Sequence, residues 1–242
     1  MLCVNGITFN MGLAHSPSII SDGLVFYLDA ANTRSYSGSG LTAYSLAGLA
    51  STSSLVNGVG FTSSNNGSFV FDGTNDYASI PISLSSSNMT IELVFKINAD
   101  SPWEDIATLD DGSNTILIEQ GSVSETPNTN GYLRYYSYYA NGVGSVTNSL
   151  ASSSQYILDS KIHLSSLTVG SSLASSYFDG IFQGSASVVE NKNFNRLVLA
   201  NDLVRTGRNC SCSIYQVKLY NRALSATEIL QNYNATRKRF GL

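Results

Sequence analysis

Apolar and polar residues alternate along much of this chain. Residues 89–97 are the clearest case, since every second position is apolar and shares one face of a strand: Ile91, Leu93, Phe95 and Ile97. A continuous apolar run at 24–28 fits a buried strand. About ten short runs of these kinds alternate with turn signals, and a helical period is nearly absent. The pattern predicts an all-β fold, a two-sheet antiparallel sandwich.

Three segments have the pattern of β-hairpins. In residues 69–81, two strand-like runs flank Asp72-Gly73, whose glycine supplies the positive φ that reverses a chain. This predicts a hairpin with an oxygen-rich tip. Two more hairpins are predicted, one turned by residues 110–114 and one by residues 179–180.

One helix is predicted, at residues 226–235, after the last strand. Ser225 and Glu228 match a capping box, in which the side chain of each residue accepts a hydrogen bond from the backbone N–H of the other. The basic residues 237–239 follow near the negative end of this helix.

Composition limits the classes of partner. A chain of 242 residues with 43% hydrophobic residues can bury one principal core. Only 12% of the residues are charged and the net charge is -4, so we expect no nucleic-acid or membrane partner. The many Ser, Thr, Asn and Gly residues are typical of extracellular or virion β-proteins.

The cysteines and the N-terminus give no sign of a disulfide framework, a zinc site or a signal peptide. Cys3, Cys210 and Cys212 form no even disulfide framework, and no nearby ligands complete a zinc site, so we expect them to be packing residues. The first residues lack a basic region followed by an apolar block, so a cleaved signal peptide is not expected.

Five segments carry a family resemblance, in the family's order: 23–30, 67–77, 89–96, 177–180 and 214–229. Together they resemble the laminin-G-like jelly roll of the concanavalin A-like lectin and glucanase superfamily. The resemblance implies a single jelly-roll domain at residues 22–236 that includes the C-terminal helix. Residues 1–21 would then form an N-terminal arm and residues 237–242 a basic C-terminal tail.

Both ends of the chain resemble virion structural proteins of tailed bacteriophages, through residues 11–20 and 231–242. This resemblance implies a non-enzymatic capsid decoration protein or tail and adhesion component. Its partners would be other virion proteins, bound through the arm and the tail, with many copies in one assembly. The protein would be assembled in the host cytoplasm and released by lysis. The alternative is a lectin module that binds host or environmental glycans.

Two acidic loops are candidates for a metal site. Calcium prefers six to eight oxygen ligands, and Asp72, Asn75 and Asp76 supply several within one turn. Asp110 and Asp111 would contribute if their loop lies nearby. The competing interpretation is that these side chains cap their own turns. We therefore expect that no cofactor is required and keep calcium as a hypothesis.

Aromatic side chains are candidates for glycan contact where they are exposed. Tyr136 and Tyr138 alternate within a tyrosine-rich strand at 132–139, and they could stack on sugar faces or fill the core. Trp103 follows a proline in a loop, where it could contact a ligand or close the end of the sandwich.

Catalysis is not expected. A glycosidase needs two carboxylates about 5–10 Å apart, and the sequence lacks the Glu-x-Asp-x-x-Glu strand pattern of the related glucanases. Glu92 is a lone carboxylate in an ordinary strand and is predicted to lie on the surface. His163 also lies in a strand-like run, without a nucleophile elbow elsewhere in the sequence.

Overall fold

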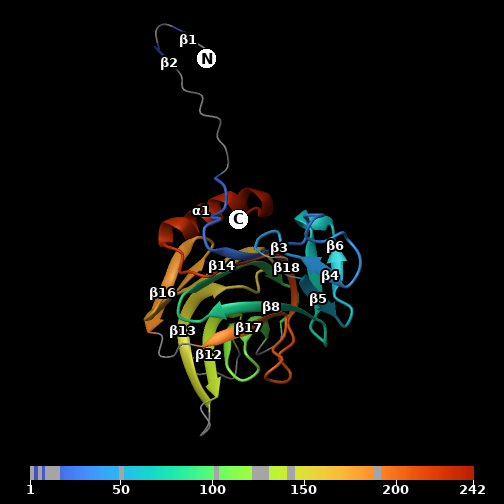
Figure 1. Cartoon of the computed structure of the whole chain (residues 1–242). Helices are drawn as coiled ribbons and strands as arrows, with labels where there is room; N and C mark the ends of the chain where they lie inside the picture. The colour runs from blue at the N-terminus through green and yellow to red at the C-terminus, as the bar shows by residue number, and fades with distance from the viewer. Residues whose placement is uncertain are drawn as a thin grey trace.

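The structure is a computed structural model of the chain. It describes residues 3–4, 7–8, 17–48, 52–100, 104–121, 131–140, 145–187 and 192–242, with no description of the side chains of 3–8 and 136–155. Two β-sheets form two layers, and the helix α1 (Ala226–Phe240) lies on the outer face of one of them, as Figure 1 shows.

The sheet farther from α1 has eight strands in the order β13-β12-β11-β10-β17-β8-β5-β4, each antiparallel to its neighbours. Its strands are β4 (Thr42–Tyr44), β5 (Thr52–Val56), β8 (Tyr77–Ser85), β10 (Asp105–Asp110), β11 (Thr115–Gln120), β12 (Tyr132–Ala140), β13 (Ser145–Tyr156) and β17 (Asn193–Leu199).

The sheet beneath α1 also has eight strands, in the order β16-β15-β14-β9-β18-β7-β6, with β3 paired to β18 as well. Its strands are β3 (Leu24–Asp29), β6 (Gly60–Thr62), β7 (Ser68–Asp72), β9 (Met89–Ile97), β14 (His163–Val169), β15 (Leu173–Phe178), β16 (Ile181–Ser187) and β18 (Ser211–Tyr220). A short 3₁₀ turn, η1, covers Ser64–Asn66, and β1 (Cys3–Val4) pairs with β2 (Ile7–Thr8) apart from both sheets.

The predicted all-β, two-sheet antiparallel sandwich is therefore confirmed. The alternating apolar residues of β9 lie in the main core between the sheets, as their period predicts. Cys210 and Cys212 are buried free thiols in the same core. The hairpins turned by residues 110–114 and 179–180 are both present.

The predicted hairpin at 69–81 is wrong. β7 pairs with β18, where Phe71 lies opposite Cys212, whereas β8 pairs with β17, where Ile80 lies opposite Leu197. The turn, with Gly73 at φ 80°, therefore carries the chain from one sheet to the other. Alternation determines which face of a strand is buried, but it does not identify the neighbouring strand.

The helix begins as predicted and extends farther. Ser225 Oγ accepts from the Glu228 N–H (3.4 Å), and the Glu228 carboxylate accepts from the Ser225 N–H (2.8 Å), which completes the capping box. The helix ends at Phe240 rather than at residue 235, because the Phe240 ring is buried and Gly241 caps the end at φ 73°. Most of the predicted basic tail is thus helical.

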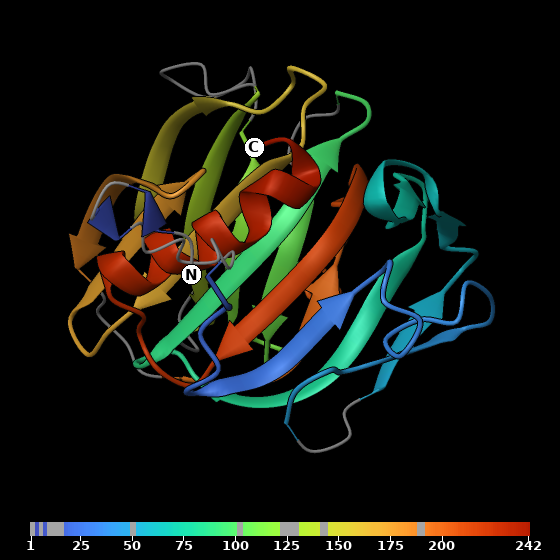
Figure 2. The same cartoon turned by 90° about the horizontal axis from the view of Figure 1, so that it is seen from above.

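A buried ion pair lies between α1 and the sheet that it covers. Lys218 Nζ lies 3.4 Å from Glu92 Oε2, and both residues are about 1% exposed. Ser166 Oγ and Asn232 Nδ2 also donate to the Glu92 carboxylate, at 3.2 and 2.9 Å. The surface position predicted for Glu92 is wrong because α1 covers this face of β9, as seen from above in Figure 2.

His163 holds a turn of the same sheet in place. Its Nδ1 lies 3.0 Å from Asp179 Oδ2, and its Nε2 lies 3.0 Å from Asp159 Oδ1. Asp179 Oδ1 also accepts from the Leu164 N–H at 2.8 Å. Burial lowers the pKa of His163, but its hydrogen bonds to Asp179 and Asp159 outweigh that effect, so the pKa lies above its ordinary value.

Replacing Lys218 by Met should destabilise the protein by about 3–5 kcal/mol, because Glu92 would stay buried without its cation. The double variant Lys218→Met with Glu92→Gln should recover most of this loss, since it removes both charges and keeps side-chain groups that can bond Ser166 and Asn232. Urea unfolding measures both. A double variant as unstable as the single one would contradict the charge explanation.

Replacing His163 by Gln should cost about 1.5–3 kcal/mol in acid, where the imidazolium bonds two carboxylates. Because the folded pKa is raised, this stabilisation is complete below the unfolded pKa and is lost as the pH rises through the folded value. The loss should therefore be larger at about pH 5.5 than at about pH 8.5. Lys161→Gln, an exposed charge beside Asp159, is the matched control. An equal loss at both pH values would contradict this role of His163.

Candidate functional site

A polar cleft of about 440 Å³ opens where β3, η1 and the last turn of α1 meet. The described residues that line it are Asp29, Ala31, Asn32, Thr33, Asn66 and Arg239. They come from three distant parts of the chain. The fold of both sheets and the docking of the helix therefore assemble this cleft.

An ion pair forms one wall of the cleft. Arg239 donates from Nη1 and Nη2 to the two Asp29 oxygens, at 2.6 and 2.8 Å. Behind it, Gln216 Nε2 donates to Asp29 Oδ2 at 2.9 Å and to the Tyr27 hydroxyl at 2.9 Å. Asp29 is 3% exposed, whereas the Arg239 side chain is 32% exposed, so the guanidinium is the accessible member of the pair.

Backbone geometry fixes the position of Asn66 beside Arg239. Asn66 has a φ of 72°, its Nδ2 donates to the Arg239 carbonyl at 2.5 Å, and its own carbonyl accepts from Arg239 Nη2 at 3.1 Å. A Cβ on Gly67 would lie 2.7 Å from the Ala31 Cβ, so this close approach of η1 to the turn after β3 requires glycine. The two exchanged bonds tie η1 to the end of α1.

The charges of the cleft balance. Burial raises the pKa of Asp29, but the hydrogen bonds and the charge of Arg239 outweigh it, so the pKa lies below its ordinary value. The hydrogen bonds that Arg239 donates to Asp29 likewise raise the pKa of Arg239. The pair is therefore fully ionised and neutral as a whole. The asparagine amides and the Thr33 hydroxyl add neutral donors and acceptors.

The first predicted acidic loop satisfies its own backbone. Both Asp76 oxygens accept from the Asp72 N–H, at 3.1 and 3.0 Å, and Asp72 Oδ1 accepts from the Thr74 N–H at 2.7 Å. Burial raises the pKa of Asp76, while the Thr74 N–H lowers that of Asp72. Asn75 is exposed, and its carbonyl accepts from Asn57 Nδ2.

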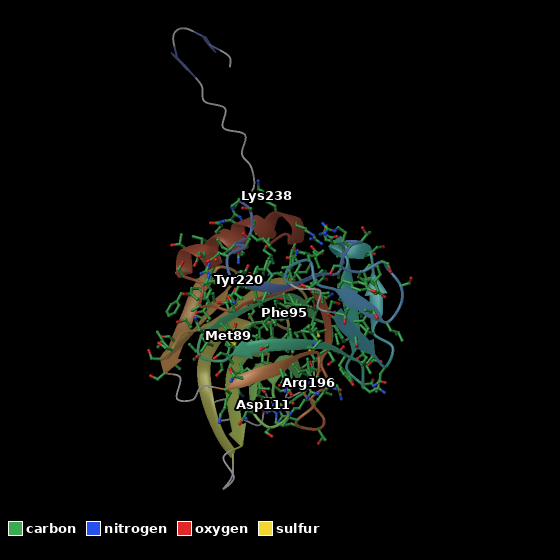
Figure 3. The ribbon with its side chains drawn as sticks, in the orientation of Figure 1. Met89, Phe95, Asp111, Arg196, Tyr220 and Lys238 are labelled. Carbon is green, nitrogen blue, oxygen red and sulfur yellow. The ribbon has the colours of Figure 1, made fainter. Side chains whose placement is uncertain are left out.

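The second acidic loop also has internal partners. Asp110 accepts from Arg196 Nε and Nη2, at 2.9 and 2.6 Å, and Asp111 caps the N–H groups of Ser113 and Asn114. Figure 3 shows Asp111 and Arg196 on the side of the molecule away from Tyr220 and α1.

The two acidic loops do not form one site. At one end of strands β8, β17 and β10, the paired residues Ala78, Leu199 and Ala107 lie side by side. Nearer the other end, the paired residues are Pro81, Arg196 and Asp110. The Asp72–Asp76 turn precedes β8 at the first end, and the 110–114 turn follows β10 at the second. Within the described residues, no group of three or more His, Cys, Asp or Glu could hold a metal. Calcium binding at either loop stays a prediction.

The predicted aromatic contacts fall outside the described side chains. Trp103 lies outside the described residues altogether, and Tyr136 and Tyr138 lie in β12 opposite Leu117 and Thr115, with no description of their rings. The neighbouring Tyr135 is fully buried, and its hydroxyl lies 2.8 Å from Ser165 Oγ. At least this member of the tyrosine-rich strand is therefore a core residue.

No pair of carboxylates suited to glycoside hydrolysis lines the cleft, since Asp29 is the one carboxylate among its described lining residues. The buried Glu92 has Lys218 as its partner, and His163 pairs with two aspartates. No described helix is long and apolar enough to cross a membrane.

Sequence reasoning did not identify the polar cleft. In the sequence, Asp29 ends an apolar run, Asn66 lies in a predicted loop, and Arg239 falls in the predicted basic tail. The usable signal was the pair of consecutive asparagines before Gly67, because Asn and Gly tolerate positive φ and mark a special turn.

Solved structures with this fold include binding domains and enzymes. The binding domain of paraclostridial mosquitocidal protein 1 has 14% identity and a TM-score of 0.65, covering 88% of this chain and 52% of that one. Domain 4 of AbnA, a GH43 extracellular arabinanase from Geobacillus stearothermophilus in complex with arabinotriose, has 11% identity and a TM-score of 0.66, covering 88% and 100%. The Trypanosoma rangeli sialidase in complex with the inhibitor DANA has 12% identity and a TM-score of 0.60, covering 91% and 35%.

At these identities the likeness shows the fold alone. The chain spans about half the length of the mosquitocidal binding domain, as its 52% coverage states. No curated protein sequence matches the chain. A laminin G family described as the concanavalin A-like lectin/glucanases superfamily matches residues 72–230, more than half of the chain. With that match and the two-sheet sandwich, the chain belongs to the laminin G-like family of the concanavalin A-like lectin/glucanases superfamily.

Proposed function

We propose that this protein is a non-catalytic, glycan-binding jelly roll. The observation that carries the proposal is the charge-balanced polar cleft formed by Asp29, Asn32, Thr33, Asn66 and Arg239. Its volume of about 440 Å³ lies within the usual range of small-ligand sites.

The cleft chemistry favours a neutral, hydroxyl-rich ligand. A hydroxyl group both donates and accepts, and the cleft offers a guanidinium donor, amides with both roles and a threonine hydroxyl. The Asp29–Arg239 pair cancels its own charge, so it gives no net attraction to an isolated anion or cation. Neutral saccharides have this combination of many hydroxyls and no net charge.

The single carboxylate among the described lining residues of the cleft favours binding without catalysis. Asp29 keeps a lowered pKa through Arg239, which makes it a poor general acid, and glycoside hydrolysis would need a second carboxylate. Among proteins of this fold, the AbnA domain was solved with arabinotriose, and the structure from mosquitocidal protein 1 is a binding domain. These likenesses support a saccharide as the class of ligand.

The setting that we propose is the virion of a tailed phage, where the domain would decorate a capsid or serve in adhesion. This rests on the resemblance of residues 11–20 and 231–242 to virion structural proteins. The chain from Pro17 onward supplies every strand of both large sheets, and β1 pairs only with β2 among the described strands. Because Ser18 and Ile20 are hydrogen-bonded to α1, we propose that the part of the arm before Pro17 contacts other virion proteins.

The variant Thr33→Trp tests the polar cleft, because an indole at this exposed position would fill it. On a glycan array, the wild-type protein should bind at least one glycan, and the variant should bind it about tenfold more weakly or less, equivalent to about 1.4 kcal/mol. Thr227→Trp, at an exposed threonine in the first turn of α1, is the matched control and should bind normally. An array without hits would contradict glycan binding.

Trp103→Ala, Tyr136→Ala and Tyr138→Ala complete the test on the same array. Each lost ring would cost about 1–3 kcal/mol if it contacts the ligand, by analogy with the value of base stacking on aromatic side chains. Loss of binding in one of these variants but not in Thr33→Trp would place the glycan site on the aromatic residues instead of the polar cleft.

Glycan binding at the polar cleft should not depend on calcium, because the cleft balances its own charges without a metal. Protein treated with a chelator should bind an array hit as tightly as protein in millimolar calcium. A calcium-dependent rise in Tm that disappears in Asp76→Asn would instead support a calcium site at the Asp72–Asp76 turn. Binding that disappears with the chelator would contradict this prediction.

A further inference from the structure

A second cleft, of about 470 Å³, lies between the two sheets on the side where β3 and β8 face each other. Its inner wall consists of Phe26, Leu84 and Leu219, which belong to the main core and are at most 4% exposed. Of the described residues that line this apolar cleft, none is charged. The cleft therefore leads from solvent into the hydrophobic core.

The sandwich is open here because its sheets end at different strands. β5 pairs with β8 only as far as Ser79, so residues 80–85 of β8 have β17 alone as a neighbouring strand in the described sheet. Opposite them, β3 pairs with the second half of β18 at the border of its sheet. Two strand edges thus border the opening.

Each of these strands has a β-bulge at the cleft. On β3, Phe26 pairs with Leu219 and Leu24 with Tyr220, which leaves Val25 as an extra residue. Leu24 packs in the cluster beneath α1, whereas Val25 packs against the main core, and both line the cleft. The bulge therefore turns Val25 towards the opening, which is the effect that bulges have at functional positions.

The bulge on β8 lies on the other wall. Pro81 pairs with Arg196 and Leu84 with Phe194, so β8 has one residue more than β17 over this stretch. Within it, Ile82 packs partly against the core and lines the cleft, while Pro81 and Ser83 are exposed at the rim. The two half-buried aliphatic side chains, Val25 and Ile82, are thus presented by bulged strands on both sides.

We propose that this apolar cleft binds the aliphatic chain of a small amphiphile, with its polar head at the rim beside Ser83. Packed sheets lie about 10 Å apart, which is too narrow for a helix with side chains, about 10–12 Å wide, so the occupant must be thinner than a helix. An apolar cavity of about 150 Å³ already binds a benzene-sized molecule, so 470 Å³ accommodates a longer chain. The absence of charge among the described lining residues selects a neutral chain.

The test compares two glucosides with the same head group. Octyl β-D-glucoside, kept below its micelle concentration, should bind wild-type protein about tenfold or more tighter than methyl β-D-glucoside, as titration calorimetry measures, because only the octyl chain can bury apolar surface. Equal binding of both glucosides would place the interaction on the sugar and overturn the proposal. No binding of octyl glucoside would also overturn it.

Two substitutions of Ile82 locate the site. Ile82→Trp fills the cleft and Ile82→Asn makes its wall polar, and each should weaken octyl glucoside binding about tenfold or more. Leu173→Trp, at a 48% exposed leucine on β15, is the matched control and should bind like the wild type. Circular dichroism identifies a variant that fails to fold, and the other variant then decides.

Sedimentation checks for a competing occupant. If wild-type protein forms dimers that Ile82→Asn converts to monomers, a second copy of the chain occupies the cleft and the proposal is overturned. Unchanged octyl glucoside binding in the folded Ile82 variants would overturn it as well. A monomer whose binding weakens in both Ile82 variants but not in Leu173→Trp supports it.

Discussion

The docking of α1 on a β-sheet depends on how the charges beneath it are satisfied. Glu92 and Lys218 lie in neighbouring strands and would each be costly to bury alone. Asn232 of α1 donates to Glu92 and to the Tyr220 hydroxyl, both at 2.9 Å, and its own oxygen accepts from the Ile20 N–H at 2.8 Å. One helical side chain therefore holds the sheet, the helix and the segment before β3 in a single arrangement.

The same polar network reaches the candidate glycan site. The Lys218 ammonium lies 5.7 Å from the Tyr27 ring centre, and the Tyr27 hydroxyl donates to Asp29 Oδ2 at 3.2 Å. Asp29 in turn binds Arg239 in the last turn of α1. Burial, followed by the charge of Asp29, raises the pKa of Tyr27, so its hydroxyl stays protonated and remains a donor. The position of the cleft wall thus follows from how the whole helix docks.

The features that could be predicted from the sequence are those that depend on residues close together in the chain. The strands followed from alternation, and the start of α1 followed from the capping box, because both depend on residues within one or two turns. The partner of β7, the burial of Glu92 and the end of the helix at Phe240 depend on residues far away in the chain. The polar cleft is the hardest feature to predict from the sequence, since Asp29 and Arg239 are 210 positions apart.

The strand β3 shows how one short segment serves two different surfaces. At its end, Asp29 faces the helix side and enters the polar cleft, while the preceding Leu28 lies in the core. At its start, the bulge at Val25 shifts the alternation, so Leu24 packs beneath α1 and Val25 packs against the core, and both line the apolar cleft. Without the bulge, strict alternation from Leu28 would direct Leu24 into the core and Val25 to the helix side. A single extra residue therefore turns Val25 towards the apolar cleft while Asp29 stays in register for Arg239.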